Sequence, residues 1–196
     1  NFFKKNNFNY LQFIPCLDPL NEEPGLYDYS LTPERYSSFL KTLFDLWYGD
    51  IINGNMISIR YFDNLVGMYM GYQPEMCGMQ GVCNCQFVIE ADGGVYPCDF
   101  YVIDEWCLGN ICNMEFDEIK LSSTSLRFVE SSKPVAAECN CCKWFKLCRG
   151  GCRRSREPFD KGNPVLNYFC PAYKEFFEYA APRLQQLADI FSRRKY

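Results

Sequence analysis

The sequence predicts an α+β fold, with a helical first part and a small cysteine-rich second part. Two long amphipathic patterns indicate helices, one beginning near Thr32 and the other following Cys170. Between them, the turn residues Asp92, Gly93 and Gly94 separate two short apolar runs, which is typical of a β-hairpin. The chain has 13 cysteines, clustered from Cys77 onward, so bound metal or disulfides are expected to organise the second part.

Composition limits the classes of protein that this chain can belong to. Its 196 residues suffice for one domain with a core, or for a small domain plus a piece of another. The net charge of −4 argues against non-specific nucleic-acid binding. No apolar run reaches membrane-spanning length and no signal peptide is visible, so we expect a soluble, cytoplasmic protein with no membrane partner. Because the chain opens with Asn1 rather than Met, we expect a piece of a longer protein.

The first part predicts one strand and two helices. Residues 9–16 read as a short buried strand, and Thr32-Pro33-Glu34 is a helix start whose apolar face continues to Gly49. A second helix is predicted over about 61–69. The residues predicted to face inward are Tyr36, Phe39, Leu40, Leu43, Leu46 and Trp47 in the first helix, and Phe62, Leu65, Val66 and Tyr69 in the second. Strand, loop and helix together indicate the closing units, the C-terminal end, of an α/β partial barrel.

The second part predicts a hairpin, short helices and one long helix. Strands over 86–90 and 95–98 form the hairpin, residues 101–103 extend its sheet, and short helices follow near 116–121 and 125–130. After Cys170 the pattern predicts a long amphipathic helix with a kink at Pro182. Its predicted inward residues are Tyr173, Phe176, Phe177, Ala180, Leu184, Leu187, Ala188 and Phe191.

Eight cysteines carry the strongest functional pattern. They are Cys77, Cys83, Cys98, Cys139, Cys142, Cys148, Cys152 and Cys170. The chain has no His, which excludes Cys2His2 zinc, Ser–His or Cys–His nucleophile pairs, and haem with a proximal His. Disulfides, all-cysteine zinc and iron–sulfur clusters stay open. The irregular spacing, closed by the remote Cys170-Pro171, favours iron–sulfur clusters.

A short basic run lies inside this cysteine pattern. It consists of Arg149, Arg153, Arg154 and Arg156. We expect these side chains to offset the negative charge of thiolate-bound clusters or to pair with carboxylates. No nucleic-acid partner is expected.

The ordered cysteines resemble the SPASM extension of radical S-adenosylmethionine enzymes. The segments 92–102, 108–111, 148–153 and 168–170 resemble, more narrowly, the anaerobic sulfatase-maturating enzymes. The resemblance covers nearly the whole chain. It implies that residues 1–72 are the last strand and helices of a radical SAM partial barrel, and that 73–196 are a SPASM domain with a C-terminal helix.

The resemblance also implies two auxiliary [4Fe–4S] clusters. Cys77, Cys83, Cys98 and Cys152 would hold the first cluster, and Cys139, Cys142, Cys148 and Cys170 would hold the second. Two-cluster ferredoxins likewise lend one cysteine of a compact run to the neighbouring cluster. The other five cysteines, which we expect to be small buried hydrophobic residues, are Cys16, Cys85, Cys107, Cys112 and Cys141.

The implied activity is oxidation of a Cys or Ser in a sulfatase polypeptide to Cα-formylglycine, an anaerobic post-translational modification. In this family a 5′-deoxyadenosyl radical abstracts hydrogen from the substrate Cβ, and Asp99 matches the proposed general base. From its position alone, Asp99 is more simply an acceptor of turn hydrogen bonds. The implied partners are the sulfatase polypeptide and a reductant such as a flavodoxin or ferredoxin.

One departure from the family pattern concerns the radical chemistry itself. No C-x3-C-x2-C run occurs, because Ser155 stands where Cys148-x3-Cys152 would need a third cysteine. We therefore expect S-adenosylmethionine and a third [4Fe–4S] cluster in a missing N-terminal part, and an inactive chain when alone. The alternatives are another SPASM enzyme acting on a different peptide, a non-catalytic zinc-binding module, and a ferredoxin-like electron carrier.

Overall fold

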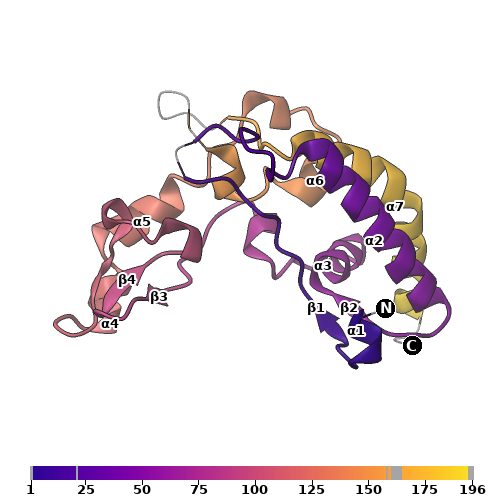
Figure 1. Cartoon of the computed structure of the whole chain (residues 1–196), viewed down its shortest axis with the longest axis horizontal. Helices are drawn as coiled ribbons and strands as arrows, with labels where there is room; N and C mark the ends of the chain where they lie inside the picture. The colour runs from indigo at the N-terminus through magenta and orange to yellow at the C-terminus, as the bar shows by residue number, and fades with distance from the viewer. Residues whose placement is uncertain (1, 21, 158, 160–164, 194–196) are drawn as a thin grey trace.

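The computed structural model describes residues 2–20, 22–157, 159 and 165–193. Figure 1 shows an arch with long helices at one end and a small hairpin unit at the other. The helices are α2 (Pro33–Ile52), α3 (Arg60–Tyr69) and α7 (Cys170–Arg193). This mixed arrangement confirms the predicted α+β class.

The helical end is built around α7, which packs against both α2 and α3. Thr32 caps α2 by accepting a hydrogen bond from the backbone N–H of Arg35, as its sequence predicts. The inward face of α2 differs from the prediction: Phe39 is 40% exposed and Leu46 66% exposed, whereas Phe44 is fully buried. Phe44 lies four residues after Leu40 and three before Trp47, so it shares their helix face while Phe39 and Leu46 point away.

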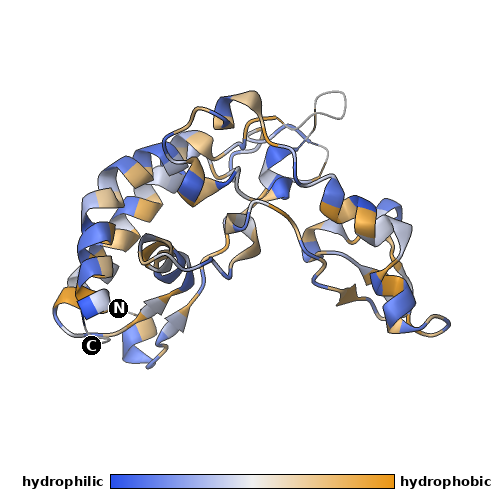
Figure 2. Ribbon diagram, turned by 180° about the vertical axis from the view of Figure 1, so that it is seen from behind, coloured by the Kyte–Doolittle hydropathy of each residue, from blue (hydrophilic) through white to orange (hydrophobic). Residues whose placement is uncertain are grey.

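The helix α7 runs unbroken through Pro182. Proline removes one backbone hydrogen bond, but Ala180 and Leu184 on either side are fully buried in the core shared with α2 and α3. Figure 2 shows hydrophilic and hydrophobic residues alternating along α2 and α7, as amphipathic helices require. Within the described ranges, no helix is long and apolar enough to cross a membrane.

Two short parallel strands join this helical end. Strand β1 (Tyr10–Leu11) pairs with β2 (Ser58–Ile59), with Tyr10 opposite Ser58, and α2 is the crossover between them. The predicted strand over 9–16 is therefore much shorter, because β2 turns directly into α3 and offers no further partner. A four-residue helix, α1 (Phe2–Lys5), precedes β1.

The hairpin unit contains a three-stranded antiparallel sheet in the order β3 (Val88–Ile89), β4 (Gly94–Tyr96), β5 (Gly109–Asn110). The predicted hairpin is confirmed, with Gly93 at φ +86° in its turn. The prediction that residues 101–103 extend the sheet is wrong, because β5 is the third strand. Tyr101 instead ends a 3-10 helix and packs edge-on against Phe128. The two rings belong to a small aromatic core.

Short helices complete the chain. The two predicted in the hairpin unit are present as α4 (Phe116–Lys120) and α5 (Ser123–Glu130). The others are η1 (Cys77–Met79), η2 (Asp99–Tyr101), η3 (Asp104–Trp106), η4 (Ala137–Cys139), α6 (Phe145–Cys148) and η5 (Arg153–Arg156). Three of these six, η1, η4 and α6, begin or end at a cysteine, and each of the other three has a cysteine at one cap, so they fix the backbone on which the thiols are carried.

Candidate metal centres

Four cysteines from four separate segments line one cavity of about 310 Å³ at the centre of the molecule. They are Cys77 in η1, Cys83 in the following loop, Cys98 at the end of the hairpin and Cys152 before η5. Burial raises the pKa of Cys98 to about 12 and that of Cys152 to about 11. The charges of Cys83 and Cys77 also raise the pKa of Cys152, so these thiols are close enough to interact electrostatically.

The other four predicted ligands line a separate, narrow cavity. They are Cys139, Cys142, Cys148 and Cys170. Burial raises the pKa of Cys148 to about 12, and the charges of Cys170, Cys139 and Cys142 add to it. Cys170 is also the first residue of α7, so the helix that fills the core also positions a thiol.

The eight cysteines thus fall into two quartets, each around its own cavity. This grouping supports the partition implied by the family resemblance; the individual ligands stay a prediction. Among the described residues, no three His, Cys, Asp or Glu side chains gather closely enough to hold a single metal ion. A four-iron cluster separates its thiolates more widely than one zinc ion does, so the two quartets are compatible with clusters.

Glycines allow the backbone to turn tightly between the two quartets. Gly150 and Gly151 have φ of +86° and +69°. A Cβ on Gly151 would lie 2.5 Å from Nδ2 of Asn167, which donates a hydrogen bond of 3.1 Å to the carbonyl of Gly150. Only glycine fits here, and this turn sets Cys148 and Cys152 on opposite sides, one in each cavity.

The basic run is largely buried rather than solvated. Arg153 is 5% exposed and pairs with Glu157 at 3.2 Å, which confirms that a carboxylate partners one of these arginines. Arg156 is 2% exposed and lines the first cysteine cavity. Its Nε is buried without a hydrogen-bond partner in the described part of the chain. A buried cation with a spare donor fits a site that holds a negatively charged, sulfur-rich group.

Asp99 lies at the rim of the first cavity, in the first turn of η2. Its side chain is exposed, and its carboxylate accepts a hydrogen bond from the neighbouring Cys98 thiol at 3.1 Å. A carboxylate that is open to solvent beside a buried quartet can reach a molecule that enters the cavity. This placement is compatible with the role of base that the family resemblance implies.

Four of the five remaining cysteines are not the buried hydrophobic residues that we expected. Cys16, Cys107, Cys112 and Cys141 are exposed, so the prediction is wrong for these four. They lie in loops or beside turns, where the backbone must stay near the surface. Cys85 is half-buried, lies 3.2 Å from the hydroxyl of Ser125 and packs against the core of Val95, Leu108 and Ile119.

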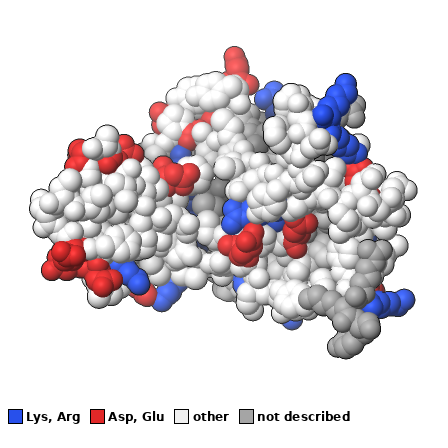
Figure 3. All heavy atoms as spheres, turned by 90° about the horizontal axis from the view of Figure 1, so that it is seen from below, with Lys and Arg blue, Asp and Glu red and all other residues white. Residues whose placement is uncertain are grey.

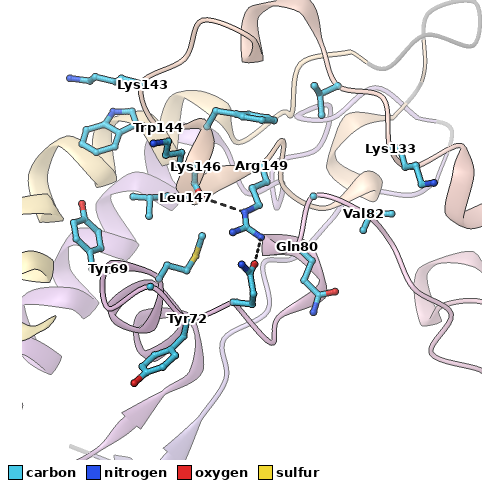
Figure 4. A pocket seen from close by; sticks show the side chains of 16 residues that line it. Tyr69, Tyr72, Gln80, Val82, Lys133, Lys143, Trp144, Lys146, Leu147 and Arg149 are labelled. Atoms are coloured by element: carbon cyan, nitrogen blue, oxygen red, sulfur yellow. Dashed lines mark hydrogen bonds between the residues drawn. The ribbon is translucent and has the colours of Figure 1, made fainter. Parts of the chain in front are cut away.

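Sequence analysis missed a second cavity, an open groove of about 810 Å³ that we call the basic groove (Figure 4). Its cations are Lys133, Lys143, Lys146 and Arg149, and its described lining contains no Asp or Glu. The Arg149 guanidinium points into it and donates to Gln73 at 3.0 Å. The groove draws on segments that are far apart in sequence, so no local pattern reveals it.

The basic groove adjoins the second cysteine quartet. Trp144 and Phe145 line both the groove and the cavity of that quartet, so a single loop separates the two. Lys143 forms an ion pair with Glu178, and Lys133 forms one with Glu130. Both pairs are exposed to solvent, and exposed ion pairs are weak.

Two thiol quartets beside a hairpin, in loops turned by glycine, define a class of protein: an iron–sulfur cluster-binding domain. A family model described as SPASM, "Iron-sulfur cluster-binding domain", matches residues 77–143. The similarity extends well beyond this segment. A cysteine-type anaerobic sulfatase-maturating enzyme of Clostridium perfringens strain 13 is 55% identical over 188 residues, or 96% of this chain and 51% of the relative.

Other relatives give the same result. The cysteine-type enzyme of Clostridium novyi is 46% identical over 195 residues, covering 100% of this chain and 52% of the relative. The serine-type enzyme of Bacteroides thetaiotaomicron is 32% identical over 200 residues, covering 93% and 47%. The solved structure described as "Native anSMEcpe with bound AdoMet and Cp18Cys peptide" superimposes with a TM-score of 0.92 at 53% identity, covering 97% of this chain and 53% of that one.

The chain belongs to the anaerobic sulfatase-maturating enzymes, and it matches their C-terminal part. It spans about half the length of the curated relatives.

Proposed function

We propose that this chain is the C-terminal part of a radical S-adenosylmethionine enzyme that converts a cysteine of a sulfatase polypeptide to Cα-formylglycine. The observation that carries the proposal is the placement of Asp99 in the same cavity as the first thiol quartet. Cysteine as the oxidised residue is supported by identities of 55% and 46% to cysteine-type relatives, against 32% to a serine-type relative.

In this reaction, residues of the chain would accept a proton and hold the acceptor of an electron. The substrate Cβ would lose a hydrogen atom to the 5′-deoxyadenosyl radical, which is generated outside this chain. The substrate thiol would then lose a proton to Asp99, and one further electron would leave to give a thioaldehyde. Water then replaces the sulfur, which departs as hydrogen sulfide, and the aldehyde remains. When bound, the clusters held by the two quartets supply an acceptor for the departing electron.

Other components lie outside this chain. We place S-adenosylmethionine and a third [4Fe–4S] cluster in the part of the protein that the longer relatives contain and this chain does not. The location would be cytoplasmic. We place the boundary between the partial barrel and the SPASM domain between residues 72 and 73. With this boundary, α7 belongs to the SPASM domain but packs in the core of the first unit, beside α2 and α3.

The reductant would be an acidic flavodoxin or ferredoxin that docks at the basic groove. Trp144 and Phe145 form the wall between this groove and the second quartet, so a donor bound there would come close to that site. Figure 3 shows acidic side chains gathered over the end of the molecule that carries the hairpin. An acidic donor would be repelled from that end and attracted to the groove.

The experiment uses full-length enzyme, reconstituted without oxygen, with S-adenosylmethionine, a reductant and a peptide carrying the sulfatase motif Cys-x-Pro-x-Arg. Mass spectrometry should show the aldehyde, which a hydrazide reagent captures. A crosslinked or rearranged peptide instead would identify another SPASM activity. Zinc without sulfide in anaerobically prepared protein would identify a non-catalytic module. Reduction of the clusters without any peptide affinity would identify an electron carrier.

A further inference from the structure

Arg156 occupies a position that few charged side chains occupy. It is 2% exposed, and two backbone carbonyls fix its guanidinium. Its Nη1 donates to the carbonyl of Pro134 at 2.7 Å and its Nη2 to that of Ser132 at 2.9 Å. Of its other N–H donors, the one on Nε is buried without a partner among the described residues. Leaving a buried donor unpaired is energetically costly, so this N–H indicates an acceptor that belongs to the assembled site.

The neighbours of Arg156 are thiols rather than carboxylates. Unlike Arg153, which pairs with Glu157, it forms no ion pair within the described residues. It lines the same cavity as Cys83 and Cys152, and it lies within electrostatic range of both. The charge of Arg156 also acts to lower the pKa of Cys139 in the second quartet, but more weakly than the other charges near that thiol raise it. Arg156 is therefore placed between the two quartets and nearer to the first.

Ser132 connects Arg156 to the backbone of the first quartet. Its carbonyl accepts from Arg156, and its hydroxyl accepts a hydrogen bond of 2.8 Å from the N–H of Cys83. The guanidinium cannot move away without disturbing this loop. A cation held rigidly beside a cluster stabilises the reduced form, which carries one more negative charge, and hydrogen bonds to sulfur act in the same direction.

We infer that Arg156 donates its Nε–H to a sulfur of the first cluster site and raises the reduction potential of that cluster. This role rests on the proposed clusters and is independent of which peptide is modified. It predicts that the first site, beside Asp99, accepts an electron more readily with Arg156 than without it.

The test is a redox titration of the reconstituted full-length enzyme, followed by EPR. In Arg156→Gln the midpoint potential of the first cluster should become more negative, and Arg156→Lys, which keeps the charge, should shift it less. Repeating the titration in a Cys170→Ser background, where only the first quartet is complete, assigns the signal. Arg154→Gln is the matched control: Arg154 is also buried, at 7% exposed, but it donates to Asp18 and lines a different cavity.

The outcomes separate this role from the function proposed above. An unchanged potential in iron-loaded Arg156→Gln, or an equal shift in Arg154→Gln, overturns the role of Arg156 only. Wild-type protein without iron and sulfide overturns the clusters as well. If Arg156→Gln fails to bind the first cluster, pulsed EPR of the wild-type enzyme labelled with ¹⁵N-arginine decides. A nitrogen coupling to the reduced first cluster that disappears in Arg156→Lys supports the role, and its absence from the wild type overturns it.

Discussion

The Cys98 thiol donates a hydrogen bond of 3.1 Å to Oδ1 of Asp99, the next residue in the chain. This contact joins a predicted cluster ligand to the proposed general base. A thiolate bound to iron has no proton to donate, so loading the first site would break the bond and leave the carboxylate without it. Binding of the cluster would thereby free Asp99 to accept a proton from the substrate.

Asp99→Asn should remove most of the activity without removing iron. Positioned acid–base groups contribute about 10²- to 10⁴-fold to rates, so we expect formylglycine formation by the full-length enzyme to fall by that range. Peptide mass spectrometry and iron analysis of the same preparation provide the measurements. Asp104→Asn, at an exposed position on the same unit, is the control. Full activity in Asp99→Asn would disprove the role of base.

Removing one thiol from each quartet should remove different clusters. Reconstituted wild-type chain should bind about eight iron and eight sulfide at the two quartets, since each [4Fe–4S] cluster takes four thiolates. Cys98→Ala and Cys152→Ala should lose the same EPR signal, and Cys170→Ala the other. Cys141→Ala is the control, because this exposed cysteine lies outside both cavities. Loss of the same signal from Cys152→Ala and Cys170→Ala would contradict the partition.

Gly151→Ala should destabilise the protein more than Gly54→Ala does. Both glycines have positive φ, at +69° and +84°, which costs a residue with a Cβ about 1–2 kcal/mol. At Gly54 nothing lies within 4 Å of the added atom, whereas at Gly151 it would meet Asn167 at 2.5 Å. Urea unfolding of the full-length variants measures the difference in the free energy of unfolding. Equal losses would show that the contact with Asn167 has no energetic importance.

The cluster-free protein should lose stability in mild alkali. Burial raises the pKa of Cys98 and Cys148 to about 12, above the ordinary value of 9.0. The folded state therefore holds these protons more tightly than the unfolded state, and its stability falls as the pH rises from about 9 towards 12. Thermal unfolding of metal-free protein across this range tests the sign. Protein with iron-bound thiolates should show a smaller fall, and an increase in metal-free stability would contradict the argument.

Reversing charges in the basic groove should slow reduction by a protein donor only. We expect Lys146→Glu with Arg149→Glu to lower the rate with an acidic flavodoxin about tenfold or more at low salt, with the difference shrinking as salt is added. Stopped-flow spectroscopy of the full-length enzyme follows this rate. Reduction by dithionite should be unchanged, and so should the flavodoxin rate in Lys120→Glu, which lies on α4. A rate that is insensitive to the double change would place the donor elsewhere.

Local signals in the sequence predicted most of the fold. The Thr32 cap, the turn at Gly93 and the periodicity around Phe176 each depend on neighbours in the chain, and all three are present in the structure. Tertiary packing decided the rest. The segment that begins at Asp99 forms a 3-10 helix in which Tyr101 packs into an aromatic core with Trp106 and with Phe128, which is distant in sequence.

The sequence also predicted part of the site, and tertiary contacts decided the rest. The family resemblance, carried by the cysteine spacing, implied which four cysteines form each quartet, and the structure gathers each of these sets around a cavity. Spacing could not show that Arg156 is buried with an unpaired donor, because this depends on carbonyls contributed by residues 132 and 134. Nor could it show the basic groove, whose cations lie on separate segments.

The position of Cys170 at the first turn of α7 has a consequence for biosynthesis. A ribosome makes the chain from its N-terminus, so α2 and α3 emerge long before the helix that covers their apolar faces. The first quartet is complete once Cys152 has been made, whereas the second must wait for Cys170. Both the core and the second quartet are therefore completed only after α7 has begun to emerge, and a donor of a second cluster would have to act after Cys170 has been made.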